Sequence, residues 1–250
     1  MSDKFITEVL RGGIPGCDLW SLNGLNLDVD TTEEDIIMAG GTQNWMALTG
    51  DTIQFVSDSA ADDGNPVGTG ACTIDAWFLD TSFNIIKETI TLNGLTAVDT
   101  TSAVLIRLLD YKVTRTGTGG ATAGNITIRK KTGPVTASVC NAGYNNKMDA
   151  TFTVPAGRAA MVMAWSCEGH WGTAAAENVE LQPRLYSRAY HATNTVPWVI
   201  SSIKSSHPVP LIFNEKTDLR ITSAVGEDNI IVAAHMDIVT IPLLAVKAFR

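Results

Sequence analysis

The sequence predicts an all-β protein, a β-sandwich or jelly-roll-like fold with an extended N-terminal arm. Short β-branched and aromatic runs recur along the chain, and Gly, Asn, Asp and Pro separate them. No long window keeps the i, i+3, i+4, i+7 apolar spacing of an amphipathic helix. The 250 residues are enough for one large sandwich or two small ones.

The expected strands fall into two series, which would close two sheets over a core. They are 52–57, 71–79, 85–92, 102–116, 124–129, 136–140, 150–154 and 158–166, and then 178–189, 195–203, 209–213, 217–223 and 230–241. The only helical candidate is short, at 4–10.

Residues 1–45 differ from the rest, because Trp20, Leu22, Leu25 and Leu27 lie among Asn, Gly and Asp residues. We expect this segment to be an arm laid over the domain or over a neighbouring subunit, since it is too irregular to build a core. The predicted domain is then 46–250, which leaves open two lobes with a boundary near 170–177.

Composition excludes several classes of partner. The chain has 26 acidic and 18 basic residues, a formal net charge of -8, and 18% charged residues. Nucleic-acid backbones and anionic membranes require a concentrated basic surface, so we expect neither as a direct partner. The N-terminal residues lack the apolar core of a signal peptide, which predicts a protein that matures in a cytoplasm with reduced cysteines.

Glycine marks two connections. Asn93-Gly94 predicts a tight turn, since both residues tolerate positive φ. The segment 117–124 carries four glycines, which predicts an exposed, flexible loop tip. It lacks the Lys-Ser/Thr of a phosphate-binding loop.

The sequence offers no recognisable catalytic apparatus. None of the histidines lies in a nucleophile motif or has the spacing of zinc ligands, and these are His170, His191, His207 and His235. Nothing singles out a carboxylate pair for glycoside hydrolysis. We therefore expect a protein that is not an enzyme and has no cofactor.

Asp58, Asp62 and Asp63 offer oxygen ligands of the kind that Ca²⁺ prefers, within one expected connection. They do not match the EF-hand pattern, and the alternative is a solvated turn in which Asp side chains bind nearby amides. The sequence favours the solvated turn over the cation site.

Large side chains outside the expected core strands predict an interface between subunits. The candidates are Trp20, Leu22, Leu25, Leu27, Trp45 and Trp171. Fully burying such side chains contributes roughly 1.5 to 3 kcal/mol each, so we expect them to find a receiving surface in a homo-oligomer.

Six stretches taken together resemble structural proteins from the virions of tailed bacteriophages of aquatic hosts. They are WSLNGLNLDV at 20–29, VSDSAADD at 56–63, GTGA at 68–71, ETITLNG at 88–94, FTVPAG at 152–157 and EKTDLRI at 215–221. The second half of the chain matches less well.

The resemblance implies a noncatalytic virion protein assembled in the host cytoplasm. It would be a capsid cement or decoration protein, a head spike, or a collar component, with the major capsid protein and further copies of itself as partners. Resemblance to spikes and cement proteins favours a trimer. The alternative is a receptor-binding or tail-fibre module that recognises host glycans through exposed Trp and Asp or Asn side chains.

Overall fold

The computed structural model describes residues 7–9, 11–43, 49–171, 181–187, 190–192, 202–226 and 230–243. Side chains are described for these residues except those of 170–171, 181–192 and 202–210. The described elements are almost entirely antiparallel β-strands, which confirms the all-β prediction. No helix in this part of the chain is both long and apolar enough to span a membrane.

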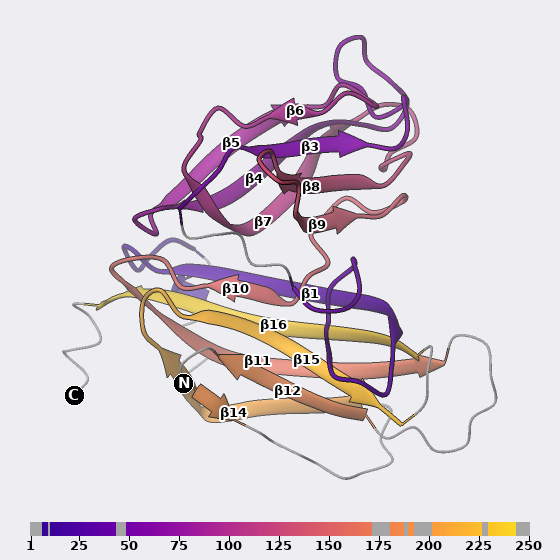
Figure 1. Ribbon diagram of the computed structural model, residues 1–250. Helices are drawn as coiled ribbons and strands as arrows, with labels where there is room; N and C mark the ends of the chain where they lie inside the picture. The colour runs from indigo at the N-terminus through magenta and orange to yellow at the C-terminus, as the bar shows by residue number, and fades with distance from the viewer. Residues whose placement is uncertain are drawn as a thin grey trace. The chain divides into compact units, whose positions relative to one another are not determined.

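The chain divides into two compact units (Figure 1). The inserted unit is Thr42–Met148, and the split unit combines Met1–Gly41 with Asp149–Arg250. This division differs from the expected boundaries after residue 45 and near 170–177, since the first and last parts of the chain fold together.

The inserted unit contains two antiparallel sheets. The first has the order β6 (Val98–Asp99), β3 (Ile53–Ser57), β8 (Ile126–Lys130), β9 (Thr136–Cys140), and the second has the order β5 (Ile85–Thr91), β4 (Ala71–Asp80), β7 (Leu105–Thr116). These strands agree closely with those expected from the sequence.

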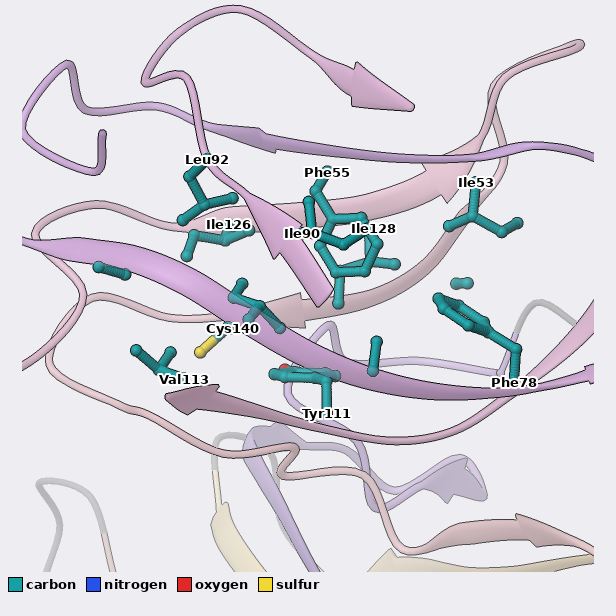
Figure 2. Close-up of a cluster of buried hydrophobic side chains, with 14 of the residues drawn as sticks. Ile53, Phe55, Phe78, Ile90, Leu92, Tyr111, Val113, Ile126, Ile128 and Cys140 are labelled. Carbon is teal, nitrogen blue, oxygen red and sulfur yellow. The ribbon is translucent and has the colours of Figure 1, made fainter. Parts of the chain in front are cut away.

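Both sheets contribute to the core of the inserted unit, which Figure 2 shows. Alternate residues of β3 are buried, as the period of a strand requires. Phe55 meets Phe78 of the other sheet edge-on, with ring centroids 6.3 Å apart. Ile53, Ile74, Ile128 and Tyr111 are completely buried in the same cluster. The core is drawn entirely from residues of this unit.

The split unit also contains two sheets. One has the order β1 (Asp18–Val29), β16 (Ile230–Pro242), β11 (Arg158–Trp171), β14 (Ser202–Phe213). The other has the order β10 (Thr151–Thr153), β15 (Asp218–Val225), β12 (Leu181–Ser187), β13 (Tyr190–Ala192), and β2 (Glu34–Asp35) also pairs with β15. Trp20 of the first sheet packs on Phe152 of the second, with ring centroids 5.4 Å apart.

The prediction of an extended arm is wrong for residues 18–29. This segment is β1, which pairs with β16 from Asp18 opposite Thr240 to Val29 opposite Ile230. Residues 34–35 form β2, and Arg220 of β15 makes a 3.0 Å ion pair with the buried carboxylate of Asp35. Of the expected helix at 4–10, the described residues 7–9 are helical.

Asp110 of β7 gives the inserted unit a predicted pH dependence. Burial raises the pKa of its carboxyl group, and nearby Lys147 opposes the shift only in part. The folded state then binds this proton more tightly than the unfolded state, so stability falls as pH rises from the ordinary Asp pKa through the folded value. We expect Asp110→Asn to raise the stability of the inserted unit at neutral pH and to leave it unchanged in acid. Urea unfolding at several pH values measures this, and a variant less stable than the wild type at pH 7 contradicts it.

Candidate functional site: the loop end of the inserted unit

Four connections of the inserted unit meet at one end of its sandwich, and we call this surface the loop end. The connections are 58–70, 92–97, 117–125 and 141–146. They gather here because β3, β5, β7 and β9 end, and β4 and β8 begin, at the same end of their antiparallel sheets.

The side chain of Asp62 joins two of these connections, 58–70 and 117–125, to the adjoining ends of β3 and β4. Its side chain is completely buried, and its carboxylate accepts four hydrogen bonds. The donors are the Ser57 hydroxyl at 2.6 Å and the backbone N–H groups of Ala71 at 2.6 Å, Ala123 at 2.8 Å and Gly124 at 2.9 Å. Bonds between a carboxylate and N–H groups are among the stronger ones in proteins, so one side chain fixes three chain segments.

Glycine allows these segments to touch through their backbones. A Cβ atom on Gly70 would lie 2.1 Å from Oδ1 of Asp62. A Cβ on Gly117 would lie 2.0 Å from the carbonyl oxygen of Gly68, and a Cβ on Gly68 would lie 2.1 Å from that of Ala61. Real Cβ atoms essentially never approach so closely, so only glycine fits these positions.

The predicted loop tip at 117–124 is exposed at residues 118–120, as expected, but hydrogen bonds attach its backbone to a neighbouring connection. Gly117 N–H donates to the Gly70 carbonyl and Gly119 N–H donates to the Thr69 carbonyl, both at 2.7 Å. The glycines of this loop therefore serve close packing, which their sequence pattern alone does not distinguish from mobility.

The exposed surface of the loop end is poor in charge. In all four connections the charged side chains are Asp58, Asp62 and Asp63, and Asp62 is buried. Val67 and Leu95 are each 62% exposed, and they lie on turns that a bridge between Asp63 and Asn93 joins. The guanidinium of Arg115, at the end of β7, also lies at this surface, since it donates to the Gly64 carbonyl at 3.0 Å. The loop end thus presents two aliphatic side chains on a braced support with few charged groups.

The carboxylates proposed as a cation loop have other partners. Asp58 accepts bonds from the backbone and side-chain nitrogens of Asn125, and Asp63 accepts one from the Asn65 N–H. Among the described residues, no three His, Cys, Asp or Glu side chains gather closely enough to hold a metal ion. The Asp side chains bind amides, as the turn alternative predicted.

The predicted interface residues of β1 do not form one surface. Trp20 packs on Phe152, and Leu22 is 4% exposed. Leu25 and Leu27 lie on the face of the strand opposite to Leu22, because side chains alternate along a strand. Leu25 is partly buried and Leu27 is 45% exposed. The chain therefore supplies its own receiving surface for Trp20 and Leu22.

Two further predicted interface residues are placed less fully. Trp45 lies outside the described residues. The backbone of Trp171 pairs with Ile230 at the end of β11, and its side chain is outside the described part. Sequence reasoning also missed Val67 and Leu95, although both lie in turn-like segments where an aliphatic residue is unexpected.

His235 is the histidine whose side chain the structure describes. Its Nδ1 lies 3.0 Å from Oδ1 of Asn23, and its Nε2 lies 3.1 Å from Oδ1 of Asp237. Ser21 donates its hydroxyl to the same Asp237 oxygen at 2.9 Å. The serine thus bonds to the carboxylate and not to the imidazole, which is not the arrangement that activates a nucleophile.

Comparison with known proteins gives no family for this chain. No family model matches it, and no curated protein matches it. Among solved structures it has a weak likeness to the VP2 subviral particle of infectious bursal disease virus, with 12% identity, a TM-score of 0.23, and coverage of 96% of this chain and 78% of that one. A TM-score this low carries no argument about function.

Proposed function

We propose that this chain is a noncatalytic structural protein of a bacteriophage virion, assembled in the host cytoplasm. It would be capsid-associated, as a cement or decoration protein or a head spike, or it would belong to the collar. The resemblance of six sequence stretches to tailed-phage virion proteins supports the choice of particle.

The observation that carries the proposal is the braced loop end, which has few charged groups and leaves Val67 and Leu95 exposed. Protein interfaces place apolar side chains at their centres and keep charge away from them. A surface already fixed by Asp62 also loses little conformational entropy on binding. We propose that the loop end contacts a neighbouring virion protein, such as the major capsid protein.

We also propose that the chain forms a homo-oligomer, and we favour a trimer. Its basis is the resemblance to spikes and cement proteins, because β1 no longer supplies an arm that crosses to another subunit. Leu27 of β1, which is 45% exposed, is the most exposed of the predicted anchors in this strand and is open to such a contact.

We predict that a Val67→Asp, Leu95→Asp double variant is lost from particles. Two buried carboxylates would oppose burial of the loop end, so occupancy should fall by about tenfold or more. The measurement is quantitative mass spectrometry of purified particles, with electron cryomicroscopy to locate the chain and count its copies.

The matched control is Val104→Asp, Val135→Asp. These side chains are 45% and 37% exposed at the opposite end of the same sandwich, so this variant should keep full occupancy. Absence of the wild-type chain from particles would refute the virion role. Normal occupancy of the loop-end variant would refute the loop end as the contact.

A further inference from the structure

An apolar row crosses the outer face of the four-stranded sheet that contains β1. Trp20 points from β1 toward the second sheet, where it packs on Phe152, so the adjacent Leu19 points to the outer face. Residues that lie directly opposite each other on neighbouring strands share a face. The row has one residue on each strand, and its members are Leu19, Val239, Met161 and Ile212.

The chain covers most of this row with residues 7–17, which we call the strap. Val9 of the strap is 5% exposed and lies in one buried cluster with Met161 and Val239. Two further strap residues, Ile14 and Cys17, pack against the same cluster. Ile212, at the end of the row on β14, remains 53% exposed. An apolar side chain thus lies uncovered beside the surface that the strap occupies.

The first part of the strap, residues 7–13, is a turn closed by its own hydrogen bonds. The backbone N–H groups of residues 11, 12 and 13 donate to the carbonyls of residues 7, 9 and 8, at 3.1, 3.0 and 2.8 Å. The connection from this turn to β1 contains Gly16, whose φ of 75° is one that glycine adopts readily. Arg158 of β11 holds the end of this connection, because it donates to the Gly16 carbonyl at 3.0 Å and forms an ion pair with Asp18. The turn can therefore move as one piece about the connection while β1 stays in its sheet.

We propose that copies of this chain exchange straps, so that the strap of one copy packs on the apolar row of the next. Strap exchange is a form of the self-association proposed above and therefore rests on it. Every copy carries both parts, and the row already fits the strap, so exchange keeps Val9 in the buried cluster. It adds burial of Ile212, which a second copy brought to this end of the sheet can cover. Exchange from each copy to the next closes a ring, and a trimer satisfies this arrangement.

Two single variants of the full chain each remove one half of the contact. Val9→Asp places a charge on the strap and leaves the row intact, whereas Met161→Asp places a charge in the row and leaves the strap intact. Each variant alone should raise the dissociation constant of the oligomer by about tenfold or more, because a carboxylate would be buried in an apolar cluster. Size-exclusion chromatography with light scattering measures the mass, and hydrogen exchange of β11 and β16 shows that each variant is folded.

The two variants mixed in equal amounts should associate again. The intact strap of a Met161→Asp copy can occupy the intact row of a Val9→Asp copy, which predicts a complex with one copy of each. Association through surfaces other than the strap and the row predicts no such recovery. An oligomeric wild type whose mass Val9→Asp leaves unchanged, or a mixture that stays monomeric, overturns strap exchange and leaves self-association standing. A monomeric wild type overturns both.

Ile212→Asp tests the uncovered end of the row without placing a charge under the strap. Ile212 is exposed in the single chain, so the fold should be kept, while the dissociation constant of the oligomer should again rise by about tenfold. The matched control is Val135→Asp, at a side chain 37% exposed on the inserted unit, and it should associate as the wild type does. Equal association of Ile212→Asp and the wild type would show that no second copy covers Ile212, which contradicts strap exchange as proposed.

Discussion

Replacing Asp62 with alanine is expected to destabilise the inserted unit by roughly 4 kcal/mol or more. The change removes an acceptor from the N–H groups of Ala71, Ala123 and Gly124 and from the Ser57 hydroxyl. A buried donor left without an acceptor costs about 1–3 kcal/mol. Such a loss is a large fraction of the stability of an ordinary domain, about 5–15 kcal/mol.

Asp62→Asn should cost about half as much, roughly 2 kcal/mol. The amide keeps one acceptor oxygen, but its NH₂ group then faces donors such as the Gly124 N–H. Hydrogen exchange of the strands β3, β4 and β8 reads the stability of the inserted unit separately from the rest of the chain.

The matched control is Asp63→Asn, one residue away. Asp63 is partly exposed and accepts one bond, from the Asn65 N–H at 2.8 Å, which the asparagine oxygen can also accept. Its effect should stay within about 0.5 kcal/mol. A cost below about 1 kcal/mol for Asp62→Ala would mean that Asp62 does not hold the loops together.

The sequence predicts most strands of the inserted unit because both of its sheets alternate buried and exposed residues. In β3, Ile53, Phe55 and Ser57 are buried and the residues between them are partly exposed. Alternation of apolar and polar residues involves only neighbouring positions in the chain, so it can be recognised in a single sequence. The same holds for β16, whose observed bounds nearly coincide with the expected 230–241.

The sequence does not predict β1 because its inward-facing positions are not all apolar. Gly24 has no room for a side chain, since a Cβ there would lie 2.5 Å from the carbonyl oxygen of Ile36. Asn26 is 1% exposed and donates its amide to Glu34 at 2.9 Å. A glycine and an amide at alternate inward positions look like a polar, irregular segment. The contacts with Ile36 and Glu34 explain why a glycine and an amide fit at these positions. The periodicity of the β1 sequence gives no sign of these contacts.

The contacts of the loop end could not be predicted from the sequence either. The sequence places Asp58, Asp62 and Asp63 in one connection, but the donors to Asp62 include Ala123 and Gly124, about sixty residues further along the chain. Only the folded topology brings them together. The glycines at 68, 70, 117 and 124 are the available signal, because they permit the close backbone approach that the carboxylate then fixes.

The two units should respond differently to truncation. The inserted unit, residues 42–148 alone, is expected to fold, because β3 to β9 pair only with one another among the described strands and its core contains only its own residues. The chain also enters and leaves the insertion at neighbouring points of the split unit. There Met38 N–H donates to Asp149 Oδ1 at 3.0 Å, and Ala150 N–H donates to the Ile36 carbonyl at 3.0 Å.

Deletion of residues 1–45 is expected to unfold the split unit and to leave the inserted unit intact. The deletion removes β1 and β2, and with them the buried side chains of Leu22, Val29, Ile36 and Ile37. At roughly 1.5 to 3 kcal/mol each, their loss is comparable with the whole stability of a domain. An arm laid over a folded 46–250 domain would predict no such effect.

Hydrogen exchange of both fragments, each compared with the full chain, decides between these outcomes. In the 46–250 fragment, β11 and β16 should lose protection while β4 and β7 keep it. In the 42–148 fragment, β4 and β7 should be protected as they are in the full chain. Replacing 42–148 with a short Gly/Ser linker is the reciprocal control, and β11 and β16 should then stay protected. Native protection of β16 in the fragment that lacks β1 would show that β1 is dispensable, because β16 would then hold its place in the sheet with β11 alone.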